Sequence, residues 1–327
     1  ISLLCILLLM PAAMRQLGGY RLLLAVAAGL IAHLLGSWVA YWYFPDIGVY
    51  HEPVDKSTVF ERMGGLGHPN ELGFYSAYTV LICAGLGVSR RVSWWLVGAA
   101  MLLGAATLMS CYSRTAMVVC CIGLMFTFQD YWRQRSNAIV GVGVVAMLLV
   151  ALFIALGTTG FDWTIERILV DLTKTGTTDE LTTITGRTQI WQYAVQQIVQ
   201  SPILGHGYCS ARFIMEGDSS HCHNVLLNAL LFGGVLSGMV VLAMCLYQLY
   251  AITLTPDPIV DGLAACMLVG GLVEGLLYAP SPAASVVIWI MLLFWRQLNM
   301  QIPTRELEAS IYRSATASTL RPSDAAP

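Results

Sequence analysis

Apolar segments long enough to cross a lipid bilayer take up most of this sequence. A transmembrane helix needs roughly 20 mainly apolar residues. Hydrophobic residues make up 57% of the chain and charged residues only 11%, and the mean hydropathy is +0.69. These values predict an all-α polytopic membrane protein and exclude a soluble globular domain. The predicted spans are approximately residues 1–14, 22–44, 71–88, 93–110, 115–129, 138–157, 224–250, 259–278 and 282–297.

Basic residues in the short loops set the predicted orientation, because cytoplasmic loops of membrane proteins are enriched in Lys and Arg. The basic loop residues that fall on one side of the spans are Arg15, Arg21, Arg90, Arg91, Arg133, Arg135 and Arg296. The opposite side then holds residues 45–70, 110–114, 158–222 and 278–282. We expect these four segments to be exported, and the long polar segment 158–222 to carry the chemistry.

This pattern divides the chain into four parts. Residues 1–157 are expected to form N-terminal transmembrane helices, and earlier spans to precede them, because the chain opens inside an apolar run without a methionine. Residues 158–223 are expected to form an exported catalytic loop with an amphipathic helix, and residues 224–298 the C-terminal transmembrane helices. Residues 299–327 are rich in Ser, Thr, Ala and Pro and are expected to form a disordered cytoplasmic tail.

Two arginines stand at the expected N-termini of exported-side helices. Arg114 follows Ser113, a suitable N-cap, and opens the 115–129 span. Arg187 opens an amphipathic helix that ends before Pro202. The apolar residues that recur in this helix at helical spacing are Ile190, Trp191, Ala194, Val195, Ile198 and Val199.

An arginine at a helix N-terminus is locally unfavourable by about 0.3–1 kcal/mol, because the macrodipole already places positive charge there. A bound anion reverses that sign, since the backbone N–H groups and the guanidinium then converge on it. Arg114 and Arg187 therefore indicate a site for a strongly anionic group. Salt bridges to exported carboxylates would satisfy them equally well. Those acids are Glu61, Asp162, Glu166, Asp179 and Glu180.

His223 is the candidate general base. It opens the 224–250 span, where the positive end of the helix dipole disfavours its protonated form. A neutral imidazole can accept a proton, which a general base requires. The alternative is an interfacial histidine that only hydrogen-bonds a loop.

His221 and His223 also raise the alternative of a metal site. Alternate residues of an extended segment share a face, so both imidazoles could reach one zinc ion. The remaining ligands would come from Glu216, Asp218 or His206. The spacing is not a recognised ligand pattern, so we predict no metal and no cofactor.

Glu274 is the one clearly intramembrane acid, about one turn below the exported end of the 259–278 span. Charged groups at that depth are usually paired or functional, and the expected partner is Arg114. Two exported cysteines, Cys209 and Cys222, are either bonded to each other or free.

Several short motifs on the exported side resemble one known family when they are taken together. They are Gly67-His68-Pro69-Asn70-Glu71-Leu72-Gly73, Ser113-Arg114-Thr115-Ala116, Gly186-Arg187 through Trp191, Ser201-Pro202-Ile203-Leu204-Gly205-His206-Gly207, and His223-Asn224 followed by Gly233-Gly234. This order and spacing is similar to that of the O-antigen ligase and O-antigen polymerase superfamily of bacterial envelope glycosyltransferases. The resemblance covers roughly residues 60–245.

The resemblance implies a multi-span helical fold of the lipid-dependent membrane glycosyltransferase type, in the bacterial inner membrane. It also implies metal-independent transfer of a glycan from undecaprenyl diphosphate to an acceptor hydroxyl in the periplasm. Arg114 and Arg187 would bind the diphosphate and His223 would activate the acceptor, with inversion at the anomeric carbon. The substrate-binding residues implied are Asn224, which helps to place that histidine, His68, Asn70, Glu274 and His221.

The sequence leaves the acceptor open. The acceptor would be the end of another lipid-linked repeat in a polymerase, a lipid A core sugar in a ligase, or a protein hydroxyl in a protein O-oligosaccharyltransferase. Among these, we favour polymerase or exopolysaccharide assembly. A transporter or flippase of lipid-linked oligosaccharide is the alternative from another class. It would place charges along the spans, near the membrane midplane, whereas the polar residues here gather on one face. No basic stretch suited to nucleic acid is present.

Overall fold

The computed structural model describes residues 2–53, 59–129, 187–215, 221–254, 256–275 and 284–299. The expected span 138–157, most of the exported loop 158–222 and nearly all of the expected tail 299–327 lie outside these ranges. So do Glu216 and Asp218.

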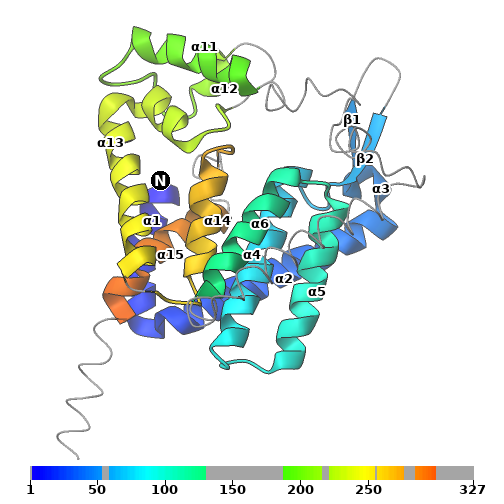
Figure 1. Cartoon of the computed structure of the whole chain (residues 1–327). Helices are drawn as coiled ribbons and strands as arrows, with labels where there is room; N and C mark the ends of the chain where they lie inside the picture. The colour runs from blue at the N-terminus through cyan, green and yellow to red at the C-terminus, as the bar shows by residue number, and fades with distance from the viewer. Residues whose placement is uncertain are drawn as a thin grey trace, which may run out of the picture.

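The described chain is mostly helical (Figure 1). The longer helices are α1 (Ser2–Leu17), α2 (Gly19–Tyr43), α4 (Pro69–Val88), α5 (Trp94–Ser110), α6 (Arg114–Thr127), α11 (Arg187–Gln200), α13 (Val225–Leu254), α14 (Asp261–Gly271) and α15 (Ala284–Asn299). The short helices are α3 (Pro45–Gly48) and α12 (Ala211–Ile214). By length and composition, α2, α4 and α13 can cross a membrane, while α5, α6, α14 and α15 are shorter apolar helices.

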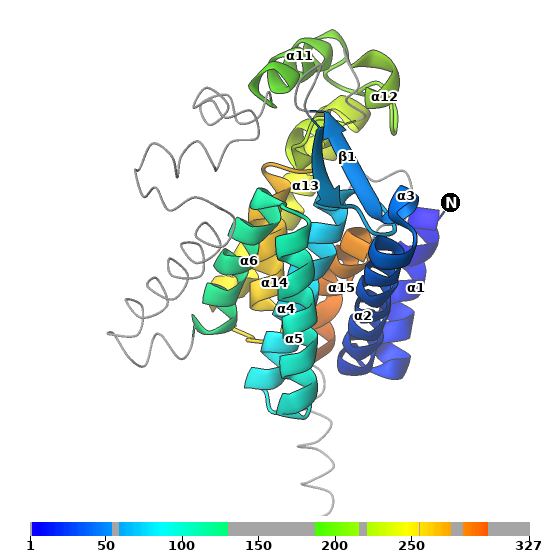
Figure 2. The same ribbon diagram turned by 90° about the vertical axis from the view of Figure 1, so that its right-hand side faces the viewer.

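Helix α4 forms the centre of the bundle, between α2, α5, α6 and α14 (Figure 2). Its glycines allow neighbouring backbones to come close, as small residues do between membrane helices. A Cβ added at Gly73 would lie 2.6 Å from the Cβ of Ser113, and one at Gly85 would lie 2.7 Å from the Cα of Ile259. Substitution of either glycine would therefore push a helix or loop away from α4.

The all-α prediction missed a β-hairpin. Strands β1 (Val49–Pro53) and β2 (Val59–Met63) pair antiparallel, with Tyr50 opposite Arg62. Arg62 is almost fully buried, and its Nε donates to the carbonyl of Cys111 at 2.8 Å. The hairpin is thereby fixed to the turn that precedes α6.

The described loops gather at two ends of the bundle. The β-hairpin meets the turn at Cys111 at one end, where α11 and α12 also lie (Figure 1). At the other end, Tyr20 donates a hydrogen bond to the carbonyl of Arg91 at 3.1 Å. Arg296 forms a buried ion pair with Asp261 at that end as well.

Helix α13 is broken at Gly233 and Gly234, whose backbone angles are not helical. The Pro202 carbonyl enters this break and accepts a hydrogen bond from the Val235 N–H at 2.8 Å. Farther along the same turn, the N–H groups of His206 and Gly207 donate to the carbonyls of Leu231 and Phe232 at 2.8 and 2.9 Å. These bonds fasten the chain that follows α11 to the upper half of α13.

Replacing Gly234 with alanine is expected to destabilise the protein by about 2–4 kcal/mol, through backbone strain and overpacking. Its φ is +62°, and an added Cβ would stand 2.1 Å from the carbonyl oxygen of Ile203. Thermal unfolding of the purified protein in detergent measures the effect. The matched control is Gly98→Ala in α5, where an added Cβ meets nothing within 4 Å. Equal melting temperatures for the two variants would contradict this account of the break.

Candidate active site

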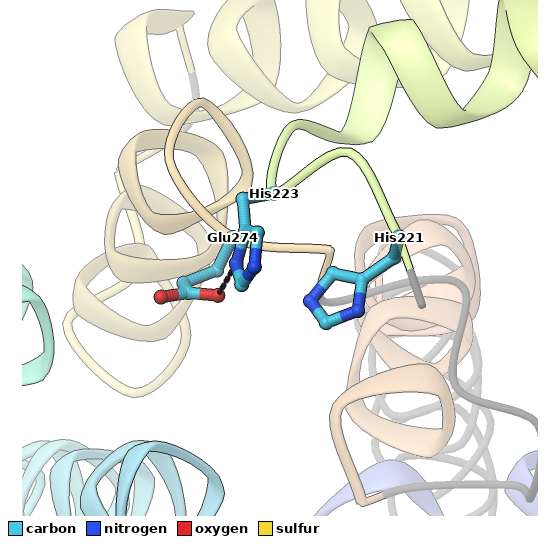
Figure 3. Close-up of side chains that lie close together, drawn as sticks. All are labelled: His221, His223 and Glu274. Atoms are coloured by element: carbon cyan, nitrogen blue, oxygen red, sulfur yellow. Dashed lines mark hydrogen bonds and ion pairs between the residues drawn. The ribbon is translucent and has the colours of Figure 1, made fainter. Parts of the chain in front are cut away.

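Three distant segments of the chain meet at the carboxylate of Glu274. Arg187 Nη2 donates to Glu274 Oε1 at 2.5 Å, and His223 Nδ1 lies 2.9 Å from Glu274 Oε2. Figure 3 shows the second of these contacts, with the ring of His221 reaching toward it from the opposite side. The carboxylate is 8% exposed, the guanidinium 12% and the His223 side chain 23%. The cluster is therefore mostly desolvated but still accessible.

Two expectations about Glu274 were wrong. It does not lie within a helix that runs to residue 278, because α14 ends at Gly271 and Glu274 lies in the following turn. The side chains bonded to its two oxygens are Arg187 and His223, where the sequence predicted Arg114. The apolar run continues through Leu272 and Val273, so the hydrophobic pattern did not reveal the turn.

Helix α11 holds Arg187 in place, and the predicted extent of this helix is confirmed. Its fully buried residue is Ala194, which packs in a cluster with Leu231 and Phe232 of α13. Trp191 Nε1 donates to the carbonyl of Cys222 at 2.9 Å. Arg187 and the backbone next to His223 are thus positioned by the same helix. Val195 and Val199, two of the apolar residues that recur at helical spacing, are exposed.

His223 lies in a strained loop that asparagines hold in place. Its φ is +47°, a left-handed conformation that residues other than glycine rarely adopt. Asn224 Oδ1 accepts from the N–H groups of Leu226 and Leu227 at 2.9 and 3.0 Å, so it caps α13. Asn224 Nδ2 donates to the carbonyl of Leu272 at 2.9 Å. The residue after the histidine therefore binds the turn that carries its carboxylate partner.

The charges of the site favour an ionised Glu274. Burial opposes its ionisation, but the hydrogen bond from His223 and the charge of Arg187 outweigh that effect and hold the pKa of Glu274 below its usual value. An ionised carboxylate can only accept hydrogen bonds, so the His223 Nδ1 beside it carries a proton. In the neutral ring, the lone pair is then on Nε2, the atom that a general base uses.

His221 lies beside His223, with ring centroids 4.1 Å apart and ring planes tilted by 45°. Burial, together with the neighbouring His223, lowers the pKa of His221 to about 4. This ring is therefore uncharged near neutral pH and adds no positive charge next to the base.

The first turn of α4 adds His68 and Asn70 to the edge of the site. His68 is the N-cap of α4, and its Nδ1 accepts from the N–H of Asn70 at 3.2 Å. Burial and then the charge of Arg62 lower the pKa of His68, with Glu274 among the groups that raise it. Asn70 Oδ1 accepts from Arg62 Nη2 at 2.9 Å, so its amide oxygen is bonded within the protein.

Arg62 is a residue that sequence reasoning missed. Its guanidinium is 1% exposed, and it reaches Glu52 Oε2 at 2.6 Å in addition to Cys111 and Asn70. The sequence signal for a buried role was that Arg62 is the one arginine in a short segment, Val59–Met63, whose pattern suits a β-strand. Arg62 joins the β-hairpin to the turn at Cys111 and to the first turn of α4.

Arg114 is the first residue of α6 and is half-buried. Ser113 is its N-cap position, as predicted, but the Ser113 side chain makes no capping hydrogen bond. Ser113 instead packs against Gly73. Arg114 therefore begins α6 at the same end of the bundle as the first turn of α4.

Of the zinc ligands suggested by the sequence, His221 and His223 lie next to each other, but none of the three residues expected to complete the set joins them in the described part of the chain. His206 Nε2 lies 2.8 Å from the carbonyl of Gln197, and Glu216 and Asp218 lie outside the described ranges. Cys209 and Cys222 are free thiols, so the bonded alternative is not what the structure has. Cys222 is buried, which raises the pKa of its thiol to about 12.

Part of this chain is similar to known proteins. Residues 99–243 match the family model described as O-antigen ligase. The chain is also 26% identical over 325 residues to the exopolysaccharide production protein ExoQ of Rhizobium meliloti (strain 1021), a match that covers 86% of this chain and 67% of that protein. The family segment contains Arg114, Arg187 and His223, whereas Glu274 follows it.

Proposed function

We propose that the chain is a periplasmic glycosyltransferase, because residues 99–243 match the O-antigen ligase family, whose members are glycosyltransferase-type enzymes of the membrane. It transfers a glycan from undecaprenyl diphosphate to an acceptor hydroxyl, without a metal ion. The observation that carries the proposal is the Glu274 carboxylate, bonded to both Arg187 and His223. One anion thereby sets a cation and a base side by side.

In the proposed reaction, His223 Nε2 takes the proton of the acceptor hydroxyl as its oxygen attacks the anomeric carbon. The bond from that carbon to the diphosphate oxygen breaks, and the lipid diphosphate leaves with the electron pair. Attack from the face opposite the leaving group inverts the anomeric configuration. Glu274 keeps the Nδ1 proton in place and stabilises the imidazolium that forms, as an aspartate does for histidine in a serine protease.

Arg187 supplies positive charge for the leaving diphosphate. A guanidinium has five N–H donors in a planar fork, so a bond to Glu274 is compatible with further bonds to phosphate oxygens. Its place at the first residue of α11 adds the positive end of the helix dipole. Arg114, at the first residue of α6, is proposed to act in the same way.

The arrangement of the helices and loops supports the proposed orientation of the protein in the membrane. The helical bundle would lie in the inner membrane, with residues 158–223 and the β-hairpin facing the periplasm and residues 299–327 in the cytoplasm. The basic loop residues near Arg91 and Arg296 then lie on the cytoplasmic side. His68, Asn70, Asn224 and His221 would line the sugar and acceptor positions.

Among the acceptors, we favour the end of another lipid-linked repeat, as in a polymerase of exopolysaccharide or O-antigen. The relative concerned with exopolysaccharide production supports this choice. A lipid A core sugar and a protein hydroxyl are the other acceptors of this class.

Deletion of the encoding gene, followed by profiling of surface glycans, tests the function. We expect long polymer to disappear and single repeats to accumulate. Long polymer that remains on its lipid carrier would identify a ligase instead. Unchanged glycans with altered uptake would contradict the glycosyltransferase proposal and favour a transporter. Complementation with the wild-type gene is the control.

A further inference from the structure

His221, His223 and Glu274 offer three ligand atoms that all lie within 4.8 Å of one another (Figure 3). Two imidazoles and one carboxylate are a donor set that zinc accepts, with a fourth position left for water. We propose that this cluster binds Zn²⁺ reversibly, and that the bound metal inhibits glycan transfer. Zinc is here an inhibitor, and the reaction itself needs no metal.

The three ligands are held in place before any ion arrives. Asn228 Oδ1 accepts from the N–H of Cys222 at 2.8 Å, between the two histidines. A Cβ added at Gly275 would lie 2.8 Å from His221 Cδ2, so the turn of Glu274 touches the histidine loop. A preorganised site loses little conformational entropy on binding.

Inhibition follows from the tautomer that a metal imposes, and this half of the inference rests on the proposed function. His223 faces Glu274 with Nδ1, so Nδ1 is the atom that an ion between the two would take. A neutral imidazole bound to metal through Nδ1 keeps its proton on Nε2. The Nε2 lone pair that would accept the acceptor proton is then no longer available.

The positive charge of Arg187 is expected to weaken zinc binding. Its Nη2 lies 2.5 Å from Glu274 Oε1, and a divalent ion on the same carboxylate is repelled by this cation. Removing the charge while keeping the carboxylate should tighten zinc binding by about tenfold or more, because charges a few ångströms apart in a partly buried site repel strongly. Arg187→Gln should therefore bind zinc more tightly while it transfers glycan more slowly. A variant that is merely unfolded would lose both properties.

Metal binding is measured on the full chain in detergent, after chelation and without donor. The probes are Zn²⁺ by calorimetry and Co²⁺ by its visible absorption. We expect one ion per chain, and a loss of about tenfold or more in affinity for His221→Ala and for Glu274→Gln, since even outer-shell changes alter metal affinity by about 10–100-fold. His206→Ala is the matched control for histidine, and Arg212→Gln is the control for loss of a positive charge. Both should bind zinc as the wild type does.

Transfer is then assayed on the chelated wild-type protein with and without added Zn²⁺. We expect full activity after chelation and loss of activity at zinc concentrations that fill the site. Binding that His221→Ala does not weaken would overturn the assigned ligands. Activity that is lost on chelation and restored by zinc would overturn the inhibitory role. A protein that binds zinc but transfers no glycan under any condition would refute the proposed function and leave the metal site standing.

Discussion

Replacing His223 with alanine is expected to lower the rate of glycan transfer by about 10²–10⁴-fold, the usual contribution of a general base. The acceptor hydroxyl then has no group to take its proton as it attacks. Binding of the lipid-linked donor should stay close to normal, because the guanidinium groups that are proposed to bind the diphosphate are retained. The measurement is in vitro transfer with purified donor, combined with a donor-binding assay.

Backbone strain at His223 calls for a second variant. Its φ of +47° disfavours alanine as well, whereas asparagine tolerates the left-handed region better. His223→Asn should therefore fold as the wild type does and still fail to transfer. His206→Ala removes an imidazole that contacts the carbonyl of Gln197 instead, and it should keep activity. Transfer by His223→Asn at more than a tenth of the wild-type rate would remove this histidine from the mechanism.

Replacing Arg187 with lysine is expected to slow transfer by about 10²–10³-fold, the cost of losing one preorganised donor to developing charge. Lysine keeps the positive charge but has no planar fork, so a single ammonium cannot hold Glu274 and a phosphate oxygen in the same geometry. The shorter reach to Glu274 should also leave His223 less well oriented. The measurement is kcat and KM for transfer, with kcat expected to carry most of the loss.

Arg212→Lys is the matched control, because Arg212 lies in α12 with its guanidinium 5.8 Å from the ring centroid of Phe213. It should transfer glycan at the wild-type rate. If Arg187→Lys retained activity within a few-fold of wild type, a simple charge at this position would suffice and the need for a planar guanidinium would be refuted.

Local signals in the sequence predicted the helix ends well. Pro69 and Pro202 marked the start of α4 and the chain after α11, because proline cannot continue a helix without a break. The membership of Arg187 and His223 in one cluster was also expected, and the structure places both at Glu274.

What the sequence missed depends on contacts between distant residues. The hairpin was overlooked because Glu61 and Arg62 read as a polar loop, whereas the burial of Arg62 depends on Cys111, 49 residues away. Likewise the bond from Arg187 to Glu274 joins residues 87 apart. Neither the hydrophobic periodicity nor the composition of a sequence shows which distant residues pair. For this reason Arg114 was wrongly expected as the partner of Glu274.

The order of the three clustered residues along the chain has a consequence for biosynthesis. Glu274 follows Arg187 by 87 residues and His223 by 51. A growing polypeptide therefore exposes its guanidinium and its imidazole before the ribosome has made the carboxylate that joins them. The proposed catalytic geometry is completed only after α14 has been synthesised, so a chain whose synthesis stalls earlier lacks the carboxylate of this centre.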